Sequence, residues 1–177
     1  MKNLSRRKFL GTAPVAAAAG IALTEATLFS FHAAGQGAAG AAPATFRLFT
    51  AQSVQDDVKA LQASPGANNL VDAPNLLFTV VLTTEKAKSG AEFEWHEGRD
   101  HVFQILEGST RYEVGGTPKG AHSTGPGEWL APASEGASTF TLKKGDMLVV
   151  PRGTPHKRST AESVTFLAIS PKGSAKA

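Results

Sequence analysis

The chain contains no cysteine among its 177 residues. Thiolate metal sites and iron–sulfur clusters are therefore excluded, and no disulfide can stabilise the fold in an oxidising compartment. Histidine is scarce as well, with five residues in the whole chain. Three of the five lie in two short segments, so their grouping is a strong pointer to a shared role.

A basic excess is missing from most of the chain. Residues 1–34 carry a net charge of +3, which equals the net charge of the whole chain, so the remainder is neutral. No helix-turn-helix or other nucleic-acid reader pattern occurs in the sequence. We therefore predict no nucleic-acid partner.

The sequence also lacks an uninterrupted apolar run long enough to span a membrane. The stretch from Thr12 to Phe31 is rich in alanine, but Pro14, Gly20 and Glu25 interrupt it. These residues argue against a stable spanning helix. Small residues follow at 33–44, and a basic segment precedes the stretch, which is the order of a signal peptide.

The basic segment reads Ser5-Arg6-Arg7-Lys8-Phe9-Leu10. It resembles the twin-arginine export signal, with Gly11 where a lysine often stands. The resemblance implies the twin-arginine export machinery as a partner and an exported, periplasmic protein. We therefore expect residues 1–42 to be a signal peptide with its cleavage region, and we exclude them from the fold.

About 135 residues remain, which suits one domain. Short apolar segments separated by glycine and proline predict an all-β sandwich or barrel at 76–170. The expected strands are 76–83, 92–96, 102–107, 110–114, 138–142, 147–150, 155–158 and 163–169.

The lead-in at 43–75 is expected to hold a strand at 45–50, a short helix at 53–62 and a turn-rich piece at 63–74. Ser53 can cap the helix, and Val54, Val58 and Leu61 recur at helical spacing. Residues 171–177 read as a flexible tail.

Residues 115–136 form a connection rich in glycine and proline that contains His122, Glu128 and Trp129. Connections of this length are uncommon unless they are functional or disordered. One interpretation is a lid over the mouth of the barrel, with His122 or Trp129 touching a substrate. The other, which we favour for His122, is a solvated surface loop.

A candidate metal site is split between two segments. Glu94 and His96 lie two residues apart in a predicted strand, so both face the same side. A short turn follows, and His101 then opens a second strand. His156 comes from a third strand, after a turn at 151–155. Three imidazoles and one carboxylate suit Fe, Mn, Ni, Cu or Zn much better than Ca or Mg.

A single histidine on an apolar strand is more often a hydrogen-bonded core residue than a metal ligand. Three histidines and one glutamate on the same predicted faces are harder to explain in that way. Burying four ionisable groups together without a metal is costly. We therefore predict that the chain binds one divalent transition metal.

The two segments resemble the two motifs of the cupin family. The second motif is complete, with Gly145, Pro151, Gly153 and His156 at the required positions, although Thr160 replaces its trailing asparagine. The first motif departs from the family pattern. With Gly108 fixing the register, Glu94 stands at the first histidine position, His96 at the second, and His101 at the glutamate position; Lys88 stands where the opening glycine is expected.

The resemblance implies a double-sheet jelly roll in which Glu94, His96, His101 and His156 hold the metal. Phe103, Ile105 and Val149 are expected to line the pocket. The leading functional hypothesis is a metal-dependent enzyme acting on a small molecule, a dioxygenase before an isomerase or lyase. The alternative is a non-enzymatic periplasmic protein that binds a small molecule or the metal itself. A homodimer is also plausible, since such barrels often pair through their sheets.

Overall fold

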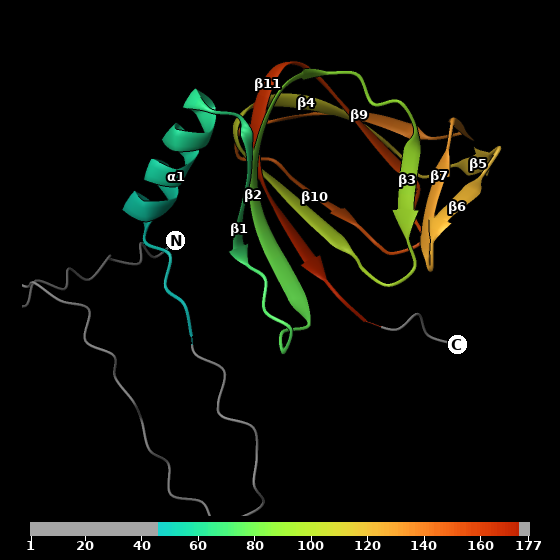
Figure 1. Ribbon diagram of the computed structural model, residues 1–177. Coiled ribbons are helices and arrows are strands. Elements are labelled where there is room, and N and C mark those ends of the chain that lie inside the picture. The colour runs from blue at the N-terminus through green and yellow to red at the C-terminus, as the bar shows by residue number, and fades with distance from the viewer. Residues whose placement is uncertain (1–45, 174–177) are drawn as a thin grey trace, which may run out of the picture. The chain divides into compact units, whose positions relative to one another are not determined.

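A computed structural model describes residues 46–173. The predicted signal peptide at 1–42 lies outside these residues, as does most of the predicted tail. The described chain is an all-β jelly-roll barrel with one helix, which confirms the predicted fold class (Figure 1). Among residues 46–173, no helix has both the length and the apolar character that crossing a membrane requires.

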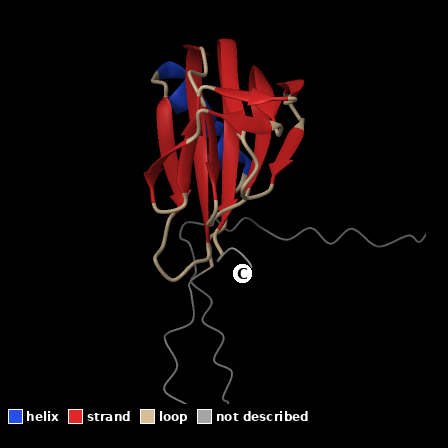
Figure 2. Ribbon diagram, turned by 90° about the vertical axis from the view of Figure 1, so that its right-hand side faces the viewer, coloured by secondary structure: helices blue, strands red, loops and turns tan. Residues whose placement is uncertain are grey.

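All but one of the elements are strands, and Figure 2 shows them in red with the helix in blue. Every strand pairing within residues 46–173 is antiparallel. In chain order the elements are α1 (Ala51–Ala63), β1 (Gly66–Val71), β2 (Phe78–Lys88), β3 (Phe93–His96), β4 (His101–Val114), β5 (Thr117–Lys119), β6 (His122–Gly125), β7 (Glu128–Ala131), β8 (Ala133–Glu135), β9 (Ser138–Lys143), β10 (Met147–Val150) and β11 (His156–Pro171).

The long strands β4 and β11 form the frame of the barrel. They pair with each other antiparallel along most of their length, from His156 opposite Val114 to Ile169 opposite Val102. The first part of β4 also pairs with β10, and its last part pairs with β9 instead. The change of partner falls at Gly108, where β4 bends, so one strand serves both sheets of the jelly roll.

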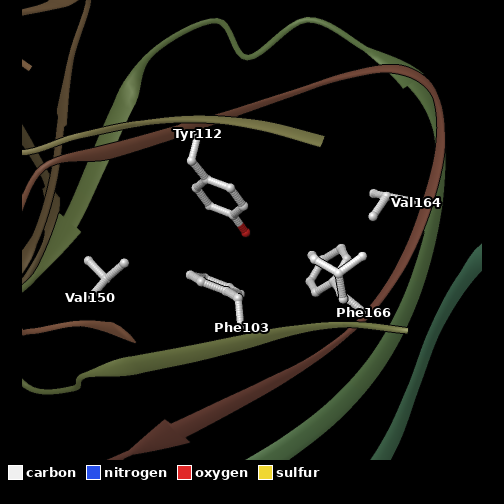
Figure 3. Packing of buried hydrophobic residues seen from close by; sticks show 6 residues of the cluster. Phe103, Tyr112, Val150, Val164 and Phe166 are labelled. Atoms are coloured by element: carbon white, nitrogen blue, oxygen red, sulfur yellow. The ribbon is translucent and has the colours of Figure 1, made fainter. Parts of the chain in front are cut away.

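The space inside the barrel is filled by side chains from β4, β10 and β11. Figure 3 shows the rings of Phe103, Tyr112 and Phe166 converging there, with Val150 and Val164 beside them. The ring centroids of Phe103 and Tyr112 are 5.2 Å apart, and those of Phe103 and Phe166 are 6.0 Å apart. Aromatic pairs at these separations add stability beyond the area they bury.

Helix α1 packs on the sheet through the apolar face that its sequence predicts. Val54, Val58 and Leu61 form a second core with Leu70 and Leu82 from β1 and β2. The helix begins after Thr50, whose side chain accepts a hydrogen bond from the backbone N–H of Ser53 at 3.1 Å. The predicted cap at Ser53 is therefore wrong by one turn, and the predicted strand at 45–50 is absent from residues 46–50.

The turn-rich piece predicted at 63–74 contains strand β1, which pairs with β2 at the edge of the sheet. Two pairs of predicted strands are single strands: β4 covers 102–107 and 110–114, and β11 covers 155–158 and 163–169 apart from Pro155. The turn residues between the paired segments predict a break in each strand. Both strands instead continue through these residues.

The connection at 115–136 is not a structureless loop, because it contains four short strands. Strands β6 and β7 extend the main sheet beside β3, while β5 and β8 pair with each other. His122 is exposed, as expected. Glu128 lies opposite His96 in the register of β3 and β7, so this segment contributes to the surroundings of the candidate site.

Candidate metal centre

The structure brings three of the four predicted ligands together. His96, His101 and His156 each offer one ring nitrogen, and these nitrogens all lie within 4.8 Å of one another. The ring centroids are 4.9 Å apart for His96 and His101, 5.4 Å for His101 and His156, and 5.8 Å for His96 and His156. The rings meet edge to face, and His96 and His156 are buried.

The bend of the barrel is what makes this meeting possible. His101 opens β4 and His156 opens β11, and because the two strands are antiparallel these residues lie at opposite ends of the paired region. Because the strand pair curves around the barrel, its two ends approach each other, and the ring centroids of His101 and His156 lie 5.4 Å apart. His96 is at the end of β3, which pairs with β11 at Glu94 opposite His156.

Each imidazole has a partner at its Nδ1 atom. His101 Nδ1 is 2.8 Å from the Ser170 hydroxyl, and His156 Nδ1 is 3.0 Å from the Thr154 carbonyl oxygen. The carbonyl can only accept, so His156 carries its proton on Nδ1 and presents the Nε2 lone pair. His156 Nε2 is buried and has no hydrogen-bond partner within residues 46–173. Buried polar atoms are rarely left this way.

The environment keeps two of the imidazoles neutral. Burial lowers the pKa of His101 to about 3, and the neighbouring His156, His96 and Arg99 contribute in the same direction. Burial also lowers the pKa of His156. Neutral imidazoles are the form that binds a metal.

Among the three histidines, the shortest hydrogen-bond distance at Nδ1 is that of His96. Its Nδ1 lies 2.6 Å from Glu128 Oε2, and Arg99 donates to both carboxylate oxygens, with Nη1 2.6 Å from Oε1 and Nη2 2.9 Å from Oε2. Burial raises the pKa of the Glu128 carboxyl, but the hydrogen bonds from Arg99 and His96 outweigh it and hold the pKa below its usual value. Glu128 is therefore an anionic acceptor for His96.

Glu94 is close to the cluster without belonging to the set of three. Its Oε1 lies 3.7 Å from His156 Nε2, and its side chain is 53 % exposed. The sequence prediction that Glu94 and His96 face the same side fits this position. A role for Glu94 as a fourth ligand stays a prediction.

A pocket of about 260 Å³ meets the cluster at His156 and Glu94. Other residues in its wall are Lys88, Tyr112, Leu130 and Arg158. The pocket gives a small molecule room beside His156 and Glu94. This arrangement combines a nitrogen-rich cluster with an adjoining cavity.

The predicted pocket-lining residues lie elsewhere. Phe103 stacks on His101 with ring centroids 5.2 Å apart, and Ile105 is deeper in the core, so both support the cluster from the interior and neither lines this pocket. Val149 is 59 % exposed, and the expectation for it is wrong. Val149 pairs with Val102, whereas Leu148 pairs with the inward Phe103, so the prediction was one residue out of register.

Sequence reasoning did not find Glu128 and Arg99 as neighbours of the site. Glu128 belongs to the segment 115–136, for which the sequence leaves a lid and a surface loop open. Arg99 lies in the predicted turn between His96 and His101. The alternation of Glu128, Trp129 and Leu130 is too short to predict a strand, and nothing in it indicates pairing with β3. The one sequence feature that could have pointed to Glu128 is its place next to Trp129, one of the two tryptophans of the chain. Trp95 and Trp129 are opposite each other in the pairing of β3 with β7, and their rings stack.

A second ion pair ties together the loops that precede two of the histidines. Asp100 Oδ1 accepts hydrogen bonds from the Arg152 backbone N–H at 2.8 Å and from Arg152 Nε at 3.1 Å, and Oδ2 accepts from Nη2 at 2.7 Å. These bonds hold the pKa of Asp100 at about 2, below its ordinary 3.8. Asp100 precedes His101, and Arg152 lies in the turn before His156, so the pair joins the two motifs.

We expect Asp100→Asn to lower the free energy of unfolding at pH 7 by about 1 kcal/mol, a value discounted because the side chain is 31 % exposed. Since the folded pKa lies below the unfolded one, the contribution of the carboxylate is complete above about pH 4 and is lost as the pH falls through 2. Urea unfolding of both proteins at pH 7, 5 and 3 measures this. Asp56→Asn, an exposed change in α1, is the control; a difference that persists undiminished at pH 3 would contradict the prediction.

No family model matches the chain, and no curated protein matches it. The chain is similar to solved structures of low identity. One is an uncharacterised protein with a double-stranded β-helix domain from Klebsiella pneumoniae, at 16 % identity over 75 % of this chain and 95 % of that one, with a TM-score of 0.48. Another is a cupin-2 domain protein from Shewanella frigidimarina, at 18 % identity over 67 % and 92 %, with a TM-score of 0.46. A cupin protein from Bacteroides fragilis has 18 % identity over 64 % and 82 %, with a TM-score of 0.44.

Proposed function

We propose that His96, His101 and His156 bind one divalent transition metal through their Nε2 atoms. The observation that carries this proposal is the buried, unpartnered Nε2 of His156 in the midst of two further imidazoles. All three Nδ1 atoms already have partners, and although Arg99 Nη2 approaches His96 Nε2 to 3.4 Å, the Nε2 atoms are the ones left for a shared ligand. A metal ion would satisfy the three together.

The donor set fits such an ion. Three imidazoles suit Fe, Mn, Ni, Cu or Zn, and they suit Ca and Mg poorly because those ions prefer oxygen ligands. Without a metal, the lone pair of the buried His156 Nε2 has no hydrogen-bond donor within residues 46–173, at a cost in free energy. Glu94 is proposed as a further ligand or as an acid–base group, on the basis of its 3.7 Å approach to His156 Nε2.

We propose further that the protein is a metal-dependent enzyme acting on a small molecule, with a dioxygenase as the leading class. Three histidine ligands leave coordination positions free, and the pocket of about 260 Å³ adjoins the cluster. The bound metal would supply Lewis-acid activation or reaction with oxygen. In this proposal His156 and Glu94 border the reacting molecule, and Phe103 beneath His101 keeps water from the inner side of the cluster.

The proposal includes export by the twin-arginine route. Its support is the motif at Ser5–Leu10 and the order of basic, apolar and small residues that follows it. Folding around a metal before export would allow Mn or Fe to be retained where Cu and Zn otherwise bind more tightly.

The test is the metal content, by elemental mass spectrometry, of protein purified from the native exported fraction. We expect about one transition-metal ion per chain. A redox-active ion supports the oxygen-dependent enzyme, and zinc redirects the proposal to Lewis-acid chemistry. Protein that contains no metal and takes up none of the five candidate ions in solution would overturn the metal proposal, and a chain confined to the cytoplasm would overturn export.

A further inference from the structure

The three histidines differ in what holds them. His101 and His156 contact a hydroxyl and a backbone carbonyl, which are neutral groups. Of the three histidines, His96 has a carboxylate at its Nδ1 atom, that of Glu128, which comes from a segment whose role the sequence leaves open. Glu128 reaches His96 because β7 pairs with β3 in a register that sets the two residues opposite each other.

Glu128 is itself fixed by Arg99. The guanidinium donates one hydrogen bond to each carboxylate oxygen, a two-point contact that sets the plane of the carboxylate as well as its position. Arg99 Nη2 and His96 Nδ1 converge on the same oxygen, Oε2, which explains why these two nitrogens lie 2.8 Å apart. When His96 carries its proton on Nδ1, both groups donate and Glu128 Oε2 accepts from both.

We infer that Glu128 is a positioning residue for the metal centre, and that it acts through His96. By accepting the Nδ1 proton it fixes the tautomer that leaves the Nε2 lone pair for the metal. Its negative charge also raises the electron density on the ring, which strengthens His96 as a ligand. This inference rests on the proposed metal site.

The guanidinium has a different effect on the metal. Arg99 Nη2 is 3.4 Å from His96 Nε2, so it places a positive charge beside the proposed ligand atom. Arg99 therefore orients Glu128 while opposing a cation electrostatically. Removing Arg99 and removing the charge of Glu128 should consequently change metal affinity in different ways, although each change breaks the same ion pair.

The test is a titration of metal-free protein with Zn²⁺ and Co²⁺, in competition with a chromophoric chelator. We expect Glu128→Gln to weaken binding by about 10- to 100-fold and to alter the visible absorption spectrum of the Co²⁺ form. Arg99→Met should stay within about threefold of the wild type, because loss of the opposing charge offsets looser positioning. Glu97→Gln is the matched control, because the Glu97 carboxylate accepts a hydrogen bond from Trp129 Nε1 and makes no hydrogen bond to the three histidine rings.

A role confined to clamping β7 onto the turn after β3 predicts another pattern. Glu128→Gln and Arg99→Met would then lower stability in urea by equal amounts and leave the Co²⁺ spectrum and the affinity unchanged. That result would overturn the inference, as would equal affinity losses in all three variants. Wild-type protein that binds neither ion would overturn the metal proposal as well, whereas wild-type binding with an unaffected Glu128→Gln variant overturns the inference alone.

Discussion

Replacing His156 with alanine is expected to weaken metal binding by about 100- to 1,000-fold. The estimate follows from the binding free energy of four-ligand metal sites, about 10–16 kcal/mol, divided among the ligands and converted at 1.4 kcal/mol per tenfold. His156 is the clearest of the three proposed ligands, because its buried Nε2 has no hydrogen-bond partner in the described part of the chain. Competition titration of metal-free protein with Zn²⁺ measures the loss.

The polar atoms of the same imidazole contribute little to the metal-free fold. Its buried Nε2 makes no hydrogen bond within residues 46–173, and the ring is held by the bond from Nδ1 to Thr154 and by packing against neighbouring rings. His156→Leu restores most of the volume, so we expect the metal-free variant to unfold within about 2 kcal/mol of the wild type in urea. His122→Ala, at an exposed histidine outside the cluster, should change neither quantity. Undiminished affinity in His156→Ala would refute this assignment.

Sequence reasoning predicted the three-histidine cluster because motif spacing reports where strands begin and which faces they share. His96 and His101 flank one turn, and His156 follows another, so their order along the chain was sufficient to predict a common site. It could not predict that Glu94 would lie half exposed and nearer to His156 than to the other two. That position depends on the single pairing of β3 with β11.

Long-range pairing explains the other differences. Glu128 becomes a neighbour of His96 through strands of four residues, which have too few alternations for a periodic signal. Val149 faces outward because a one-residue change of register reverses every side chain of a strand. The predicted strand at 102–107 ends before Gly108, whereas β4 continues through Gly108 to Val114.

Gly108→Ala is expected to destabilise the protein by about 2–5 kcal/mol. Gly108 has φ of 74°, a left-handed conformation that costs any other residue about 1–2 kcal/mol. A Cβ at this position would lie 2.2 Å from the backbone oxygen of Ser163, so the strands must shift, at about 1–3 kcal/mol more. Domains of this size have about 5–15 kcal/mol in all.

Two other glycines separate these contributions. Gly136 has φ of 78° and open space around it, so Gly136→Ala should cost only the backbone term of about 1–2 kcal/mol. Gly66 has neither a positive φ nor a neighbour within 4 Å of an added Cβ, and Gly66→Ala should be close to neutral. Urea unfolding of the three variants gives the comparison. If Gly108→Ala costs no more than Gly136→Ala, the close contact with Ser163 is not maintained in solution.

The position of Gly108 connects this stability effect to the metal centre. Gly108 pairs with Val164 at the place where β4 leaves β10 for β9, and β11 carries its own irregularity between Ser159 and Val164. This double bend returns the start of β4 to the start of β11, and so brings His101 to His156. We therefore expect Gly108→Ala to weaken Zn²⁺ binding as well, under conditions where the variant is still folded, while Gly136→Ala leaves it unchanged. Unaltered affinity in a destabilised Gly108→Ala protein would show that the site tolerates a change at the bend, and that barrel curvature does not limit ligand placement.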